Sequence, residues 1–187
     1  GLEKQDGYAH GLKPGLDMLK LAKNAGVEEI TYYGFTTDNC GRPKEQVEAF
    51  SKACVEAINW ITAESVSLLV VGNQESPAFP KALLPYTRRT DFNGGGIRLN
   101  FLVNYGWEWD LAKLKAPGSR RMSICRQLES HDLSRIDLII RWGGMRRLSG
   151  FLPVQSVYAD FYVVDGLWQD FSKALEWYQK QDITRGG

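Results

Sequence analysis

The sequence lacks an excess of charge of either sign and lacks any long apolar run. Its 187 residues carry 23 basic and 22 acidic side chains, a formal net charge of +1. No overall field therefore attracts nucleic acid or an anionic membrane surface, and any anion must be bound by a local cluster. The longest apolar runs, such as residues 67–71, have the length of a strand and are too short to span a bilayer.

Cysteines with metal-type spacing are absent as well. Cys40, Cys54 and Cys125 form no C-x-x-C pair, so we expect three buried, reduced thiols in a cytoplasmic protein. The hydrophobic fraction of 43% and the charged fraction of 24% are ordinary for a folded protein. No repeat, linker or low-complexity tract interrupts the chain, and its length suits one core. We predict a single domain over residues 1–187.

Helical and strand patterns alternate along the chain. Apolar spacing and punctuation by Gly26 and Pro43 predict helices over 11–26, 43–61 and 172–180 and strands over 27–34, 67–72, 97–103 and 135–141. This order predicts an α/β fold, a central mainly parallel sheet flanked by helices. Ligands bind beyond the carboxyl ends of such strands. The polar segments that follow Phe35, Val103 and Ile140 should therefore gather along one edge.

The segment over residues 137–170, DLIIRWGGMRRLSGFLPVQSVYADFYVVDGLWQD, carries the densest group of candidate binding residues. Gly143 and Gly144 permit a tight turn with exposed backbone N–H groups. Arg141 and Arg147 offer forked donors and Ser149 a hydroxyl, so the segment is a candidate cradle for a diphosphate. A solvated loop with scattered charges is an equally good interpretation of the spacing alone.

This segment resembles the signature of the cis-prenyltransferase family, the undecaprenyl diphosphate synthase-like enzymes. That signature reads D-L-x-I-R-T-G-G-E-x-R-[IL]-S-N-F-L-L-W-Q-x-x-Y-x-E, then W-P-D-F. The positions that match are Asp137, Arg141, Gly143, Gly144, Arg147, Ser149, Phe151, Gln155, Tyr158, Trp168, Asp170 and Phe171. Residues 33–43 (YGFTTDNCGRP) are similar to Y-A-F-S-x-E-N-W-x-R-P, and residues 100–110 (NFLVNYGWEWD) to N-I-x-x-N-Y-G-G-R-x-[DE]. The blocks occur in the family's order and cover most of the chain.

The resemblance implies a cis condensation of isopentenyl diphosphate with an allylic diphosphate, which makes a polyprenyl diphosphate for a glycosyl carrier lipid. The diphosphate of isopentenyl diphosphate would be held by Arg141, Arg147, Ser149, Gly143 and Gly144. Asp160 stands where the family has a glutamate that helps to bind Mg²⁺, and a hard cation of this kind prefers oxygen ligands.

The second block would supply the residues near the reacting ends of the substrates. The resemblance places Thr36, Asn39 and Arg42 there as catalytic residues, with Thr36 in place of a serine of the family. Asn39 has an alternative interpretation as the cap of a turn or helix.

The family also implies an apolar tunnel for the growing prenyl chain. Candidate lining residues are Phe50, Cys54, Ala57 and Ile58, although their spacing is equally typical of an ordinary core. Trp60, Trp107 and Trp109 are candidates to limit the length of this tunnel.

Several positions depart from the family's pattern. Its D-G-N-x-R-W motif, which binds magnesium and the allylic diphosphate, is not in the sequence, and we expect it before Gly1. Trp142 and Met145 replace the threonine and the glutamate of R-T-G-G-E. Thr184 takes the place of the arginine in the family's R-x-G end, which reaches into the partner's active site, whereas a shifted register would use Arg185.

Three hypotheses follow from these matches and departures. The first is a homodimeric prenyltransferase that contacts membranes only through its product. The second is a subunit of a heteromeric enzyme of the archaeal or eukaryotic type, in which a second homologue supplies the R-x-G arginine. The third is a non-catalytic, prenyl-lipid-binding scaffold on the same fold. The retained Arg141, Arg147 and Ser149 favour the first two, and Met145 and Thr184 favour the third. None of the three involves nucleic acid.

Overall fold

A computed structural model describes residues 12–115, 121–166 and 170–182. Helices and strands alternate along it, as the sequence predicts. In chain order the elements are α2 (Leu12–Asn24), β1 (Glu29–Thr36), the 3-10 helix η1 (Thr37–Gly41), α3 (Lys44–Ile61), β2 (Val66–Val71), the 3-10 helix η2 (Lys81–Thr87), β3 (Thr90–Phe92), β4 (Ile97–Tyr105), α4 (Trp107–Leu111), α5 (Arg121–Cys125), β5 (Leu138–Trp142), β6 (Asp160–Val164) and α6 (Phe171–Tyr178).

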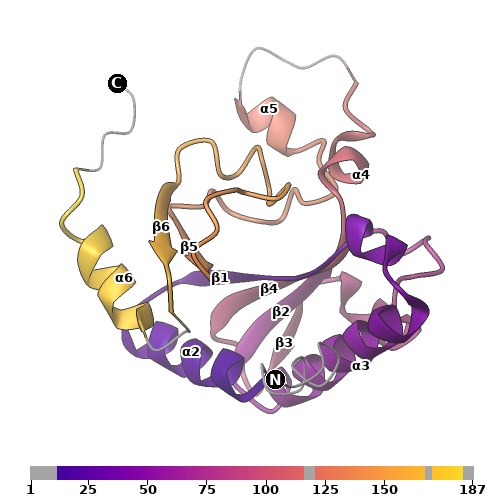
Figure 1. Ribbon diagram of the computed structural model, residues 1–187, viewed down its shortest axis with the longest axis horizontal. Coiled ribbons are helices and arrows are strands. Elements are labelled where there is room, and N and C mark those ends of the chain that lie inside the picture. The colour runs from indigo at the N-terminus through magenta and orange to yellow at the C-terminus, as the bar shows by residue number, and fades with distance from the viewer. Residues whose placement is uncertain (1–11, 116–120, 167–169, 183–187) are drawn as a thin grey trace.

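Two sheets form the centre of the molecule. The larger has the strand order β1-β4-β2-β3, in which β1, β4 and β2 are parallel and the short β3 is antiparallel to β2. The smaller pairs β5 and β6 in parallel and lies on the β1 side, with α6 beyond it (Figure 1). The predicted α/β class and mainly parallel sheet are confirmed. Strand β6 has no counterpart among the predicted strands.

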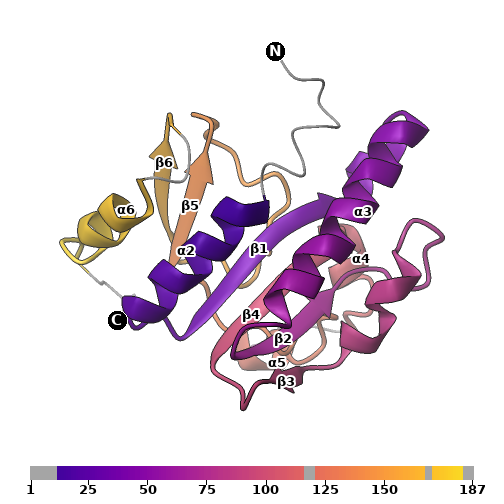
Figure 2. The ribbon, with the colours of Figure 1, turned by 90° about the horizontal axis from the view of Figure 1, so that it is seen from below.

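Helices α2 and α3 lie side by side over one face of the larger sheet (Figure 2). Helix α2 ends at Asn24, and Gly26 just beyond it, with a φ of +74° and an N–H bond to the Lys23 carbonyl (3.1 Å), confirms the predicted cap. The main core between helices and sheet includes Phe35, Ile58 and Leu99, each fully buried. Strand β5 and helix α6 pack against this same core.

Strand β4 shows why the two faces of the sheet differ. Leu99, Phe101 and Val103 face the helices and belong to the main core. Arg98 and Asn100 alternate with them and project from the opposite face. The predicted alternation along residues 97–103 is confirmed.

The cysteines only partly match expectation. All three are free, but Cys40 and Cys125 are half-buried and only Cys54 is buried. Burial among apolar side chains raises the pKa of Cys54 to about 12. Within the part of the chain that the structure describes, no helix has both the length and the apolarity to cross a membrane.

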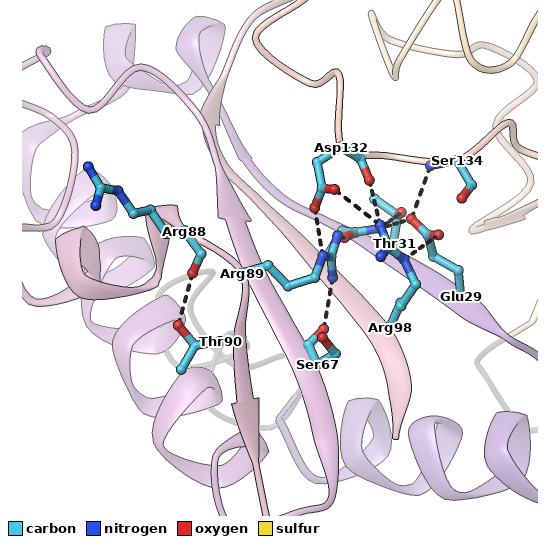
Figure 3. Close-up of polar contacts among 10 residues, drawn as sticks. Glu29, Thr31, Ser67, Arg88, Arg89, Thr90, Arg98, Asp132 and Ser134 are labelled. Carbon is cyan, nitrogen blue, oxygen red and sulfur yellow. Dashed lines mark hydrogen bonds and ion pairs between the residues drawn. The ribbon is translucent and has the colours of Figure 1, made fainter. Parts of the chain in front are cut away.

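A charged network covers the face of the sheet opposite the helices (Figure 3). Glu29 on β1 accepts hydrogen bonds from Arg98 Nε (3.0 Å) and Asn100 Nδ2 (2.6 Å) on β4, and from the Ser134 N–H (3.2 Å). Arg98 Nη2 also donates to the carbonyl of Asp132 (2.6 Å). The network therefore joins the loop over residues 132–134 to the two strands.

Arg89 closes this network from the β3 side. Its Nε donates to Asp132 Oδ2 (2.6 Å), and its Nη1 and Nη2 donate to the Ser67 carbonyl (2.9 Å) and Asn100 Oδ1 (2.7 Å). Burial alone would raise the pKa of Glu29, but the hydrogen bonds from Ser134 and Asn100 and the charge of Arg98 hold it below its ordinary value. Ionised Glu29 is therefore the form that stabilises the fold.

Glu29→Gln tests this contribution. We expect the free energy of unfolding at pH 7 to fall by about 1–3 kcal/mol, because charge-assisted hydrogen bonds and one ion pair are lost. The lowered pKa means that the wild-type stabilisation is complete above pH 4.5, the ordinary value, and disappears as the pH falls through the folded-state pKa. Urea denaturation across pH 3–7 should show a shallower acid loss for the variant. Glu28→Gln is the control, and equal pH profiles for wild type and Glu29→Gln would contradict the assignment.

Candidate functional site

The candidate diphosphate loop begins where β5 ends. Gly143 and Gly144 have φ values of +80° and +68°, and the Gly144 N–H donates to the Val164 carbonyl of β6 (3.0 Å). These positive φ values favour glycine at both positions; a Cβ on Gly144 would also lie 2.8 Å from Asp165 Oδ1, a contact that movement of the Asp165 side chain could relieve. The predicted tight turn is confirmed.

Arg141 at the end of β5 and Arg147 in the loop that follows it, the arginine loop, meet at one sulfur atom. Arg141 Nη2 lies 3.7 Å from Met145 Sδ, and Arg147 Nη2 lies 3.2 Å from the same atom. Arg147 is exposed, whereas Arg141 is half-buried and its Nε is buried with no partner within the described ranges. The structure thus brings together the two arginines that the cradle hypothesis needs, and their diphosphate role stays a prediction.

Ser149 links this loop to β1. Its φ is +52°, and its carbonyl accepts a hydrogen bond from the Tyr33 hydroxyl (2.8 Å). Burial, with a smaller contribution from the charge of Asp38, raises the pKa of Tyr33 to about 12, and the charge of Arg141 opposes the shift. The phenol therefore stays protonated at neutral pH and remains a donor to the loop.

Thr36 and Asn39 form a reciprocal cap at the start of η1. The Thr36 N–H donates to Asn39 Oδ1 (3.1 Å), and the Asn39 N–H donates to Thr36 Oγ1 (3.3 Å). The alternative interpretation of Asn39 as a cap is thus correct. Because the cap uses Oδ1, Asn39 Nδ2 remains a donor that no contact among the described residues engages, so the proposed catalytic roles stay open.

An apolar pocket of about 340 Å³ lies between α2, α3 and the sheet. Three of the four predicted tunnel residues, Phe50, Cys54 and Ala57, line it together with Trp60. The remaining lining residues are Leu12, Gly15, Leu16, Tyr32, Tyr33, Gly34, Ala53, Ile61 and Phe101. Ile58, the fourth, does not line this pocket and is fully buried in the main core.

Arg42 lies at the edge of this pocket. Its guanidinium carbon is 5.5 Å from the centre of the Phe50 ring, a cation–π arrangement with a pocket-lining aromatic side chain. Trp107 and Trp109, by contrast, belong to α4 and do not line the pocket. The pocket therefore has a cation beside it and one tryptophan, Trp60, in its wall.

Asp160 lies away from the arginine loop. It starts β6 opposite Leu138, whereas Arg141 pairs with Val163, three residues or about 10 Å further along the strands. Asp160 instead lines a separate polar pocket of about 270 Å³ with Arg135, Asp137, Tyr158, Ala159, Tyr178 and Asp182. Among the described residues no group of three histidine, cysteine or acidic side chains is arranged to hold a metal ion.

The sequence did not identify two residues that position this site. Tyr33 matches the second block, but nothing in its sequence indicates that its hydroxyl holds the carbonyl of Ser149. Asn104, buried with φ +53°, donates to the Asn73 carbonyl (3.0 Å), and its Oδ1 accepts from Cys40 Sγ (3.2 Å). It therefore joins the ends of β2 and β4 to η1. The only sequence feature that could have indicated this role of Asn104 is its position in the block over residues 100–110.

Tyr33→Phe tests whether β1 positions the arginine loop. Loss of one hydrogen bond of about 1 kcal/mol should weaken the binding of inorganic pyrophosphate about fivefold, measured by calorimetry. Tyr32→Phe is the matched control, because the Tyr32 hydroxyl donates to the Gly15 carbonyl (2.7 Å) and not to the loop. A loss of the same size in both variants would show that Tyr33 has no particular link to anion binding.

Comparison with known proteins identifies the family. A family model described as "Putative undecaprenyl diphosphate synthase" matches residues 1–186. The ditrans,polycis-undecaprenyl-diphosphate synthase, (2E,6E)-farnesyl-diphosphate specific, of Pectobacterium atrosepticum is 30% identical over 205 residues, which cover 97% of this chain and 81% of the relative. The enzyme of the same name from Salmonella typhi is 30% identical over 206 residues, with the same two coverages.

A solved structure supports the fold. Lavandulyl diphosphate synthase from Lavandula x intermedia, in complex with dimethylallyl diphosphate, superposes with a TM-score of 0.82 at 18% identity, covering all of this chain and 91% of that one. The family match extends over nearly the whole chain, and the chain belongs to the undecaprenyl diphosphate synthase family of prenyltransferases.

Proposed function

We propose that this prenyltransferase elongates an allylic diphosphate by cis condensation with isopentenyl diphosphate, giving a polyprenyl diphosphate of the kind used for glycosyl carrier lipids. The observation that carries the proposal is the convergence of Arg141 and Arg147 at the end of β5, linked through Ser149 to Tyr33 of β1. Strand β1 also contributes to the wall of the apolar pocket. One strand thus connects a cationic loop with a cavity suited to a hydrocarbon tail.

The proposed reaction needs little covalent chemistry from the protein. The alkene of isopentenyl diphosphate attacks C1 of the allylic partner, the C–O bond there breaks, and pyrophosphate leaves. A proton is lost from C2 of the isopentenyl unit, which forms the new double bond. Catalysis of this kind depends on positioning and electrostatics. Arg141, Arg147 and Ser149 would hold isopentenyl diphosphate, with the Gly143–Gly144 turn shaping the loop.

The allylic partner would occupy the other half of the site. Its tail fits the pocket lined by Phe50, Cys54 and Ala57, and Arg42 beside Phe50 is placed to meet its charged end. Asn39 would contribute its free Nδ2 donor near the reacting carbons. The pocket wall favours this orientation because it is apolar, and diphosphate is excluded from such surfaces.

Mg²⁺ would accompany the diphosphate substrates. When bound, it would neutralise charge on the leaving diphosphate. Asp160 is the predicted ligand, but it lies about 10 Å along the strands from the level of Arg141, and the described residues form no complete metal site. The mechanism proposed here therefore assigns no step to the ion.

Assembly is proposed in two forms, a homodimer or a heteromer with a second homologue. Thr184 and Arg185, the residues that bear on this choice in the sequence, lie outside the described residues. In both forms we propose a cytoplasmic protein whose contact with membranes comes through its product.

Arg147→Ala tests the site. We expect kcat/KM for isopentenyl diphosphate with farnesyl diphosphate and magnesium to fall about 100-fold or more, because a preorganised cationic donor is removed. Arg146→Ala is the matched control, since it removes the same charge from the neighbouring residue, whose guanidinium is not among the groups bonded to Met145 Sδ. Normal turnover in Arg147→Ala would rule out the assignment.

The same assay on the wild-type chain separates the remaining hypotheses. Product formation by the chain alone supports the homodimer, and product formation only after a homologous partner is added supports the heteromer. Absence of product under both conditions would leave the non-catalytic scaffold.

Ala57→Leu tests the apolar pocket. The larger side chain occupies part of the 340 Å³ cavity, so we expect shorter prenyl products at an unchanged affinity for isopentenyl diphosphate. Chain length is measured by chromatography of dephosphorylated products. Ala63→Leu, an exposed position just beyond α3, should leave product length unchanged. Products of wild-type length from Ala57→Leu would show that the tail lies elsewhere.

A further inference from the structure

Met145 places an uncharged acceptor between two positive charges. Its sulfur is contacted by Arg141 and Arg147, and a thioether is a weak acceptor that carries no charge. The signature that the loop resembles has a glutamate at this position. The side chain is partly exposed, at 37%, so both arginines are gathered at a surface that a ligand can reach.

Three arginines of the chain are paired with a carboxylate, and Arg141 and Arg147 are among the described arginines that are not. Arg89, Arg98 and Arg135 each form an ion pair with an aspartate or a glutamate. Within the described ranges neither Arg141 nor Arg147 forms one. Three acidic residues lie in the vicinity: Asp165 faces the Gly144 turn, and Asp38 and Glu108 act on the nearby Tyr33.

Arg141 adds an independent sign of an unfilled site. Its Nε is buried and has no partner in the described part of the chain. Buried donors of this kind are nearly always satisfied, by protein or by another molecule. An anion held between the two guanidinium groups would offer both a counter-charge and the acceptors that a thioether does not supply.

We infer that Met145 makes the Arg141–Arg147 pair a diphosphate subsite that binds without a divalent cation. The inference rests on the proposed function, of which it describes the isopentenyl diphosphate half. A carboxylate at residue 145 would accept from both guanidinium groups, cancel one of their two positive charges and repel the diphosphate, so that a cation would help to restore binding. The neutral thioether contacts both arginines without lowering their positive charge or repelling the diphosphate.

The test measures binding of inorganic pyrophosphate to the full chain by calorimetry, in EDTA and in Mg²⁺. We expect the wild type to bind in EDTA with an affinity within about threefold of that in Mg²⁺. Met145→Glu should weaken binding in EDTA about tenfold or more and regain part of it in Mg²⁺. Leu148→Glu is the matched control, because it adds the same charge to an exposed position of the same loop outside the Met145 contact, and its loss should be smaller.

Two results would overturn the inference. One is pyrophosphate binding by the wild type that requires Mg²⁺. This comparison of EDTA with Mg²⁺ uses the wild-type chain alone. The other is a folded Met145→Glu protein, checked by circular dichroism, whose affinity in EDTA equals that of the wild type. Because pyrophosphate binding needs no turnover, failure of prenyl transfer and failure of this subsite are distinguishable. A chain that binds pyrophosphate without metal but makes no product retains the subsite and loses the proposed function.

Discussion

The candidate site depends on the parallel pairing of β1 with β4. Glu29 lies opposite Arg98 at one end of this pair and Thr36 opposite Tyr105 at the other, so η1 and α4 both begin at the same edge. The pairing also assigns the two neighbouring tyrosines to different faces. Tyr32 packs against Phe101 beside the apolar pocket, and Tyr33 reaches the arginine loop. A slip of one residue would exchange them and separate the loop from the strand.

Local chemistry predicted the elements and the turn well. Gly26 and the Gly143–Gly144 pair have positive φ as expected, and three of the four predicted pocket residues on α3 line the pocket. The sequence could not place what depends on tertiary packing. Ile58 and Ala57 are neighbours on one helix, yet a rotation of about 100° per residue puts one in the core and the other in the pocket. The position of Asp160 likewise follows from β6, a strand that the pattern did not reveal.

Arginine serves two different purposes in this chain. On the sheet face opposite the helices, Arg89 and Arg98 bind Asp132, Glu29 and backbone carbonyls. Their charges are paired with carboxylates there, and their hydrogen bonds join a loop to the sheet. At the end of β5 the guanidinium groups of Arg141 and Arg147 contact an uncharged sulfur atom in place of a carboxylate. A formal net charge of +1 over the chain conceals this contrast. Local arrangement, and not composition, makes one of these clusters a candidate for binding anions.

The two halves of the site are carried by separate sheets. Strands β5 and β6 pair only with each other, and in the described part of the chain no backbone hydrogen bond connects them to the larger sheet. Side-chain packing of Ile140 and Trp142 on the main core, and the Tyr33–Ser149 contact, make the connection. Packed layers of this kind can slide past each other by small amounts while each keeps its own ladder. In the proposed reaction, such a shift would change the gap between a head group held by the arginines and a tail in the pocket, so successive additions to a lengthening chain need not strain either sheet.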